Sequence, residues 1–466
     1  MSVTAELARH LVRTSFDAFG PATLEGAKDR IVDTLGCVLA GKNASGCSGL
    51  AELVREAGGA PEATVLGFGC RVPAQAAALV NAVLARSYDY EPVGAFVDGK
   101  SVPAHISGTT VPTALAVAEK LGASGRELLT ALVLGDDLAA RLSAASLFDL
   151  DLGWDNTGTA NAFGATAIAG KLLELDEAEM QNAFGIVLNQ LGGTMLNIFE
   201  GTHCFKLPQG LAARAGIFSA SLAKKGFTGP KNSLTGQHGY FARYCREYDL
   251  SVLTRDLGRT FCAGDTIKPY PCCRANHAAI DCTLALVRDH GVKAADVEEV
   301  IVGVRATAKE FAVGQEFRIG EVPQISASFS LQYAVATALL RGEVELSHFG
   351  EESIRSPEIE ALVRRIRTVG SLPPERSLGA EVTIRTKEGR EYRAAVEQPL
   401  GSDAFSPLTP SEKRKKFLRC ATFTRDLDEA KAQAVFETLR GLENVACVAE
   451  VMDRIAGRGA RRDRTG

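Results

Sequence analysis

Residues 161–173 read Asn-Ala-Phe-Gly-Ala-Thr-Ala-Ile-Ala-Gly-Lys-Leu-Leu, a stretch in which small side chains dominate. Small side chains let neighbouring helices approach closely, which is typical of a helix buried inside a bundle. Segments with apolar residues at helical spacing lie on both sides of this stretch. They cover residues 22–39, 73–87, 111–121, 127–142 and 209–224. The sequence therefore predicts that roughly the first 265 residues are mostly helical.

The pattern changes after about residue 264. Residues 299–306 alternate between apolar and polar, as in a half-buried strand. Two further predicted strands, 381–386 and 391–398, are joined by Lys387-Glu388-Gly389-Arg390, a hairpin signal. Predicted helices cover 328–340, 357–365, 411–418 and 428–439. We predict a mainly α fold in which a large helical domain (1–265 plus 401–457) carries an inserted smaller α+β lid domain (266–400). Residues 458–466 are predicted to form a flexible basic tail.

The composition excludes several classes of protein. The 466 residues carry 52 basic and 56 acidic side chains, a formal net charge of -4, which gives no general reason to bind nucleic acid or a membrane surface. No apolar run reaches the roughly 18–20 residues of a membrane span. The 11 cysteines include no C-x-x-C pair, which indicates reduced thiols in the cytoplasm. No zinc-type histidine spacing occurs, so we expect no metal.

Residues 94–101, Gly-Ala-Phe-Val-Asp-Gly-Lys-Ser, formally match a phosphate-binding loop. That mechanism needs a strand before the loop and a helix starting at the lysine. Here a predicted helix precedes the loop, and Val102-Pro103 follows it, which disfavours an immediate helix. We therefore interpret the segment as a flexible loop and expect no nucleotide cofactor.

Two segments contain polar side chains that could bind or act on a substrate. His105 stands at a predicted loop-to-helix junction, where the helix N-terminus favours anions. Residues 268–277 bring together Lys268, Tyr270, Arg274 and His277 at the predicted domain boundary. A cation-rich loop that opens a helix suits a site for a small polycarboxylate.

Taken together, the chain resembles the MmgE/PrpD family over residues 10–420. The matching pieces are Asp33-Thr34-Leu35-Gly36, Val80-Asn81-Ala82, Asp89-Tyr90, His105-Ile106-Ser107-Gly108, Asn161-Ala162-Phe163-Gly164-Ala165, Gly210-Leu211-Ala212-Ala213-Arg214-Ala215-Gly216, Lys268-Pro269-Tyr270-Pro271-Cys272-Cys273 and Phe329-Ser330-Leu331-Gln332-Tyr333-Ala334-Val335-Ala336. The resemblance implies a helical domain with an α+β lid, usually in a homodimer. Its members include 2-methylcitrate dehydratase, cis-aconitate decarboxylase and iminodisuccinate epimerase.

The resemblance also implies a site. Asp89, His105, Tyr270 and His277 match the catalytic positions, with Asp89 orienting His105 and with His105 and His277 in one pocket. Lys268 and Arg274 are implied to hold the carboxylates of the substrate. Further implied contacts to the substrate come from Lys206, Asp155 and Asn156. Replacing Lys268 would then weaken binding and leave the fold intact.

The chain departs from the family pattern in several places. Glu91-Pro92-Val93 stands where the family commonly has a second acidic element, and the loop leading to His105 is longer. Asp155-Asn156 replaces a His-Pro pair, and Lys206 is shifted by one position. Because a candidate acid or base is missing, weak or no activity on 2-methylcitrate is expected.

The chemistry common to these relatives is loss of a proton or a carboxylate next to a carboxylate, without a cofactor. The leading hypothesis is a hydro-lyase acting on a small di- or tricarboxylate. An epimerase or decarboxylase acting on a similar acid is the alternative among enzymes. A non-catalytic carboxylate-binding relative is the alternative outside them.

Overall fold

The small-residue stretch forms α7 (Ala160–Leu172), a helix that is buried along nearly its whole length. The helices that pack on it are α5 (Ser107–Leu121), α6 (Gly125–Ala145), α8 (Glu177–Val187) and α10 (Leu207–Lys224). The approach is close: a Cβ atom on Gly164 would lie 2.7 Å from the carbonyl oxygen of Gly135, and one on Gly216 would lie 2.5 Å from the Cβ of Ala165. Only glycine fits at both crossings, so the small residues let α6 and α10 pack closely on α7.

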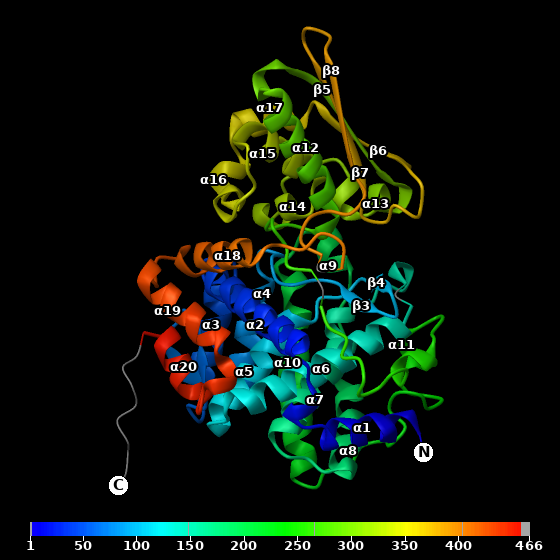
Figure 1. Cartoon of the computed structure of the whole chain (residues 1–466), viewed down its shortest axis with the longest axis vertical. Coiled ribbons are helices and arrows are strands. Elements are labelled where there is room, and N and C mark those ends of the chain that lie inside the picture. Colours follow the sequence, from blue (N-terminus) through cyan, green and yellow to red (C-terminus); the bar gives the residue numbers. More distant parts are fainter. Residues whose placement is uncertain (1, 148, 265, 403, 458–466) are drawn as a thin grey trace.

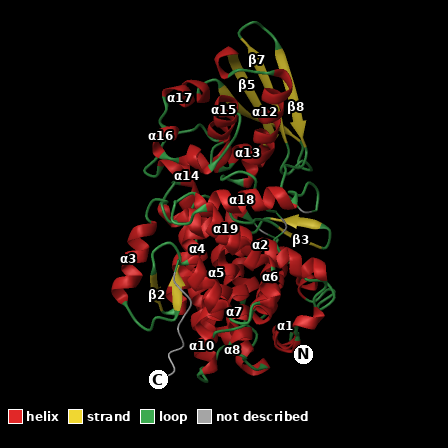
Figure 2. Cartoon of the chain, turned by 60° about the vertical axis from the view of Figure 1, so that its left-hand side comes forward, coloured by secondary structure: helices red, strands yellow, loops and turns green. Residues whose placement is uncertain are grey.

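The computed structural model describes residues 2–147, 149–264, 266–402 and 404–457. The helices around α7 are α1 (Val3–Arg13), α2 (Pro21–Gly41), α3 (Cys47–Ala57), α4 (Ala74–Arg86), α5 (Ser107–Leu121), α6 (Gly125–Ala145), α8 (Glu177–Val187), α9 (Leu196–Phe199), α10 (Leu207–Lys224) and α11 (Tyr240–Tyr244). Figure 2 shows α5 and α7 in the middle of this helical body. The five helices predicted from apolar spacing on either side of 161–173 are confirmed.

Two short hairpins accompany the helices. They pair β1 (Ala63–Val65) with β2 (Cys70–Val72), and β3 (Ala95–Val97) with β4 (Lys100–Val102). The interpretation of residues 94–101 as a flexible loop was therefore wrong in part. Asp98 and Gly99 turn the β3–β4 hairpin with positive φ angles of 51° and 74°, and this turn chemistry suits a tight hairpin.

The last helices return to the helical body. They are α18 (Pro410–Thr422), α19 (Glu429–Arg440) and α20 (Val448–Ile455). Helix α18 packs on α2, where the buried Lys416 ammonium lies 2.7 Å from a carboxylate oxygen of Asp33. The same ammonium donates to the carbonyl of Tyr90 at 2.8 Å. Helix α18 thus ties α2 to the segment that carries Asp89.

A smaller α/β unit lies at the other end of the long axis (Figure 1). Its elements are α12 (His277–His290), β5 (Val297–Arg305), α13 (Ala306–Glu310), α14 (Pro323–Ser328), α15 (Leu331–Arg341), α16 (Glu351–Ile354), α17 (Pro357–Val363), β6 (Ile366–Leu372), β7 (Ala380–Thr386) and β8 (Glu391–Val396). The sheet order is β6-β5-β7-β8, with β5 and β6 parallel and the other pairs antiparallel. Helix α12 packs on β7 and β8, and α15 packs on β6.

The chain passes between the two parts along paired segments. Thr266 bridges both Val93 and Ser402, and the Ile267 amide donates to the Gly401 carbonyl at 3.0 Å. The domain boundaries at residues 265 and 400 stay a prediction. The predicted basic tail, 458–466, lies outside the described residues.

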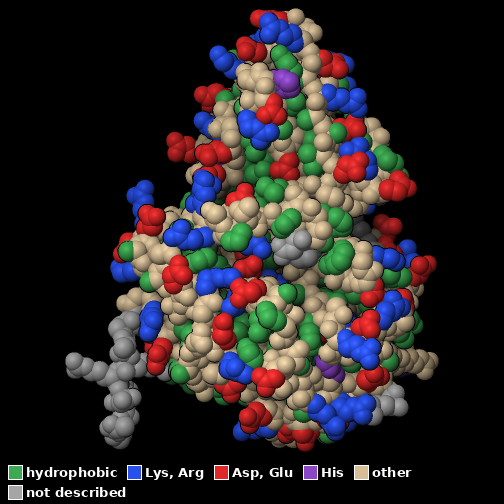
Figure 3. Space-filling view, in the orientation of Figure 1, with side chains coloured by type: hydrophobic (Ala, Val, Ile, Leu, Met, Phe, Trp, Pro, Cys, Tyr) green, Lys and Arg blue, Asp and Glu red, His purple; other side chains and the backbone are tan. Residues whose placement is uncertain are grey.

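Charged side chains of both signs are mixed over the face in Figure 3, on both parts of the molecule. No extended single-sign area covers that face, in line with the net charge of -4. Among the described residues, no helix combines the length and apolar character needed to cross a membrane.

Candidate active site

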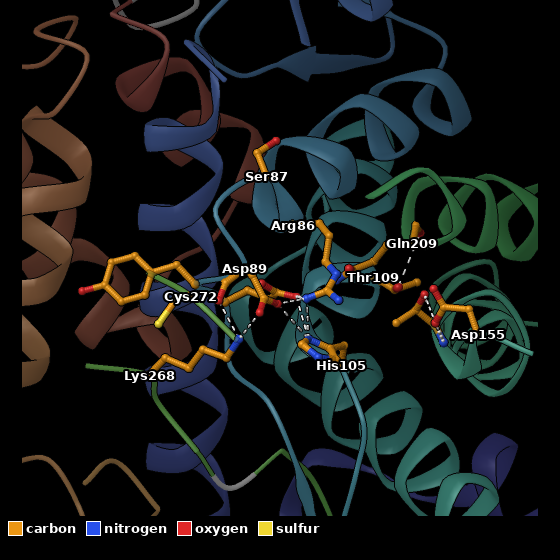
Figure 4. Close-up of polar contacts among 12 residues, drawn as sticks. Arg86, Ser87, Asp89, His105, Thr109, Asp155, Gln209, Lys268 and Cys272 are labelled. Atoms are coloured by element: carbon orange, nitrogen blue, oxygen red, sulfur yellow. Dashed lines mark hydrogen bonds and ion pairs between the residues drawn. The ribbon is translucent and has the colours of Figure 1, made fainter. Parts of the chain in front are cut away.

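The site begins where α4 ends. Arg86 is the last residue of α4, and Asp89 follows it in a left-handed conformation with φ 48°. This conformation is uncommon for a residue other than glycine. It sharply turns the chain, so that Asp89 faces back towards Arg86 (Figure 4). Glu91 also pairs with Arg86.

Four buried charged side chains form an ion cluster: Arg86, Asp89, Glu91 and Lys268. Arg86 pairs with a carboxylate oxygen of Asp89, and its Nη1 lies 3.1 Å from Glu91 Oε1. Lys268 Nζ lies 3.0 Å from Asp89 Oδ2 and donates to the Asp89 carbonyl at 2.5 Å. Two cations therefore balance two carboxylates in a part of the protein that excludes water.

The neighbouring charges keep these groups ionised. Burial opposes the charge on Arg86, but Asp89 and Glu91 outweigh burial and raise the pKa of the guanidinium. Burial would raise the pKa of Glu91, but Arg86, followed by the hydrogen bond and charge of His105, lowers it far below the ordinary value. Glu91 is thus a carboxylate under all ordinary conditions.

His105 lies at the edge of this cluster, and 21% of its side chain is exposed. Its Nδ1 lies 2.9 Å from Glu91 Oε1 and 2.9 Å from Arg86 Nη1. Burial and then Arg86 lower the pKa of the imidazole, and they outweigh Glu91 and Asp89, which raise it. The imidazole is therefore neutral near pH 7. Its Nδ1 lies between an acceptor, Glu91, and a donor, Arg86; in the tautomer that donates from Nδ1 to Glu91, Nε2 is the basic nitrogen.

Three helix N-termini converge beside His105. Asn161, in the first turn of α7, donates to the His105 carbonyl at 2.6 Å and to Thr109 Oγ1 at 3.2 Å. Thr109, in the first turn of α5, donates to the Gln209 carbonyl at 3.4 Å, in the first turn of α10. The partial positive charges of three helix ends favour anions in this region.

Asp89, Glu91 and His105 are also the described residues whose donor atoms come close enough together to hold a metal ion, within 4.8 Å of one another. Arg86 Nη1 contacts all three side chains, so a guanidinium occupies the position that a cation would need. The donor set therefore does not fit a metal ion.

Full activity is accordingly expected to survive exhaustive chelation and dialysis. The protein itself supplies the positive charge through Arg86 and Lys268. The measurement is turnover before and after treatment, and loss of activity that one added metal restores would contradict the expectation.

The structure brings together some of the predicted site residues and separates others. Asp89, His105 and Lys268 meet in the ion cluster. Burial lowers the pKa of Arg86, whereas Asp89, Glu91 and, to a smaller extent, Asp155 raise it, so Asp155 lies close enough to act on the guanidinium. Its carboxylate accepts hydrogen bonds from the Thr157 amide at 2.9 Å and the Thr157 hydroxyl at 2.7 Å, which caps the turn before α7.

Asn156 and Lys206 make local contacts instead. Asn156 donates to the Pro103 carbonyl at 2.8 Å, which fixes the segment before His105. Lys206 is buried, and its ammonium donates to the carbonyl of Ser45 at 2.7 Å and lies 3.2 Å from the thiol of Cys47. A contact of Lys206 with substrate stays a prediction.

Arg274, His277 and Tyr270 form a second group at the start of α12. Arg274 donates to the carbonyls of Leu400 at 2.6 Å and Pro399 at 2.8 Å, and lies 3.2 Å from His277 Nδ1. The other His277 nitrogen faces the Cys272 carbonyl at 3.2 Å. Arg274 therefore holds the segment at Pro399 and Leu400, where the chain leaves the smaller unit. Both ring nitrogens of His277 have partners close by in the sequence.

The remaining side chain, Tyr270, donates to Asp281 at 2.7 Å. Burial and then Asp281 raise the pKa of this phenol, so it stays protonated. His277 is also fully buried, and burial followed by Arg274 and Lys268 lowers its pKa. The described residues give no hydrogen bond between His277 and His105, so a shared pocket stays a prediction, as do substrate contacts of Arg274.

Sequence reasoning missed Arg86, Gln209 and the role of Glu91. Glu91 appeared only as a departure from the family pattern. The sequence did hold a signal for this cluster: Arg86 ends a helix, and Asp89 and Glu91 follow three and five residues later. A basic side chain at a helix end can pair with acids at that distance along the chain.

Two family models match most of the chain, and three known proteins are similar to it. The family model described as the MmgE/PrpD N-terminal domain matches residues 5–253, and the MmgE/PrpD C-terminal domain matches 270–440. The cis-aconitate decarboxylase-like protein oryM of Aspergillus oryzae is 25% identical over 98% of both chains. A cis-aconitate decarboxylase of Aspergillus terreus is 22% identical over 97% of this chain and 95% of its own. A second from that species (strain NIH 2624) is 23% identical over 86% and 85%.

Proposed function

Because this chain belongs to the MmgE/PrpD family, we propose that it is a cofactor-independent lyase that removes a proton from carbon next to a carboxylate of a small di- or tricarboxylic acid. The observation that carries the proposal is the pair of Glu91 and His105, whose Oε1 and Nδ1 lie 2.9 Å apart. A neutral imidazole held by a carboxylate is the arrangement of a general base.

The proposed step begins at Nε2 of His105. This nitrogen takes the proton, and the C–H electron pair moves onto the carbon and its carboxylate. Glu91 stabilises the imidazolium that forms, as a fixed carboxylate does in a catalytic triad. If a hydroxyl leaves from the adjacent carbon, the electron pair closes a C=C bond, and the His105 imidazolium returns its proton to the leaving hydroxyl, which departs as water.

The surrounding charges support binding of an acid. The first turns of α5, α7 and α10 contact one another beside His105, and helix N-termini carry partial positive charge. Because Arg86 and Lys268 already pair with Asp89 and Glu91, these helix ends are the better candidates to hold a substrate carboxylate.

Contacts from the smaller unit support its proposed role as a lid. Gln324 in α14 donates to the carbonyl of Ser87, the residue after Arg86, at 2.6 Å. Phe329 packs edge-on against Phe205, with ring centroids 5.7 Å apart. We also propose a homodimer in the cytoplasm, as the family resemblance and the unpaired cysteines favour.

The test is proton exchange. The enzyme is incubated in deuterated water with a panel of citrate-like and aspartate-like acids and followed by NMR, with His105→Gln as the matched control. Deuterium incorporation or elimination by the unaltered enzyme alone is expected. A protein that binds an acid and exchanges no proton would instead be a carboxylate-binding relative.

A decarboxylase is the second candidate, since the relatives at 22–25% identity are named cis-aconitate decarboxylase or decarboxylase-like. It differs in releasing carbon dioxide. Measuring carbon dioxide in the same incubations separates the two reactions, because elimination or epimerisation releases none.

The pH dependence follows from the lowered pKa of His105. A protonated imidazole cannot accept a proton, so activity falls as the pH drops through this pKa. Since burial and Arg86 lower it from 6.5, the acid limb of kcat/KM is expected below pH 6.5. A pH–rate profile checks this, and an acid limb above 6.5 would remove the neutral imidazole from the proposal.

A further inference from the structure

Buried polar atoms that lack a hydrogen-bond partner among the described residues gather around Glu91. They are Nε2 and Oε1 of Gln209, Oε2 of Glu91 and Nε of Arg86. Gln209 and Glu91 are both 0% exposed. A buried polar atom without a hydrogen-bond partner destabilises the protein, so several of them in one place indicate a polar group that binds there.

Gly108 shows how close these side chains lie. A Cβ atom on Gly108 would come within 1.6 Å of Gln209 Nε2 and within 3.2 Å of Glu91 Cγ. Both side chains therefore rest against the same point of the first turn of α5, three residues after His105. Figure 4 shows Gln209 on the side of Arg86 that faces away from Lys268.

The chemistry of these atoms selects the group that fits. Gln209 Nε2 and Arg86 Nε donate, whereas Gln209 Oε1 and Glu91 Oε2 accept. A carboxylate only accepts, so it would leave both acceptors unsatisfied and would be repelled by the ionised Glu91. An apolar group would satisfy none of the four. A hydroxyl donates once and accepts twice, so it can satisfy both donors and one of the two acceptors.

We propose that Gln209, Glu91 and Arg86 form a subsite for a hydroxyl group of the substrate, so that the acid handled here is a hydroxy acid. The inference rests on the proposed function, because it places the hydroxyl beside the base. It favours elimination of water over action on cis-aconitate, which has no hydroxyl. Gln209 is then a residue that determines specificity.

The test compares acids that differ by one hydroxyl: citrate with tricarballylate, and malate with succinate. Binding is measured by calorimetry in the His105→Gln protein, which silences proton transfer. We expect one hydroxy acid to bind at least about 10-fold more tightly than its deoxy partner. Gln209→Met, which keeps the length and removes both polar atoms, should abolish this ratio, whereas Gln181→Met, on the outer part of α8, should leave it unchanged.

A second variant guards against misfolding of Gln209→Met. Gly108→Ala places a methyl group where the Gln209 amide lies and leaves that residue itself intact, so it should also abolish the ratio. Equal affinity within both pairs, a ratio that survives Gln209→Met and Gly108→Ala, or no binding of either hydroxy acid would overturn the subsite and leave a buried water as its occupant.

The deuterium experiment with unaltered enzyme reports separately on the proposed function. Exchange without a hydroxyl preference would remove the subsite alone. A hydroxyl preference without exchange or elimination would remove the lyase and keep the subsite.

Discussion

His105→Gln lowers kcat/KM by about 10²–10⁴, the usual contribution of a general acid or base, if Nε2 of His105 is the proton acceptor. The glutamine amide can still contact Glu91 but has no basic nitrogen, so folding should change little. Steady-state kinetics on the acid identified by deuterium exchange give the measurement. His348→Gln is the matched control, because His348 is also half-buried with a lowered pKa but lies in the smaller unit. Equal losses in both variants would contradict the assignment.

Glu91→Gln extends the same prediction to the partner of His105. The loss should be of similar order, because the amide cannot stabilise the imidazolium. Glu91 raises the pKa of His105, so removing its charge should also move the acid limb to lower pH. A purely structural role for Glu91 would lower activity without moving that limb.

Lys268→Met is expected to reduce the free energy of unfolding by about 3 kcal/mol, the lower end for breaking a buried ion pair. The lower end applies because Arg86 still pairs with Asp89 after the lysine is gone. Lys268 is 0% exposed and its ammonium also holds the Asp89 carbonyl, so the replacement leaves two buried acceptors without a donor. From the sequence, this replacement was predicted to weaken substrate binding and to leave the fold intact. The buried ion pair adds the expectation that it also lowers the free energy of unfolding.

Urea denaturation followed by circular dichroism measures this change. Lys42→Met is the control, because Lys42 pairs with Asp426 at 2.7 Å near the surface, where such a pair contributes about 1 kcal/mol or less. Equal stability of the two variants would show that the Lys268–Asp89 pair is not important for folding.

The main helices could be predicted because one property, apolar spacing, decides them locally. Strand β6 (Ile366–Leu372) was missed, since it follows directly on α17 and lies at the edge of the sheet, where its partly exposed residues lack a clear alternation. A predicted helix over 357–365 was right, but nothing in the sequence marked a strand immediately after it.

The site was harder to predict because it depends on directions of side chains. His105 and Lys268 could be selected by type and position, but their meeting with Glu91 requires the turn at Asp89 and the pairing of Val93 with Thr266. Arg274 has the charge expected of a carboxylate-binding residue, yet it points to the carbonyls of Pro399 and Leu400. Composition and spacing cannot reveal that choice.

The packing of α18 on α2 has a consequence for the order in which the protein can fold during synthesis. Asp33 leaves the ribosomal exit tunnel early in synthesis. Its buried partner, Lys416, emerges only after the whole smaller unit has been made. During that interval α2 carries an uncovered face that includes a carboxylate without its cation. The nascent helical body therefore stays incomplete until nearly the last residues emerge, and a truncated chain that ends before α18 is expected to aggregate.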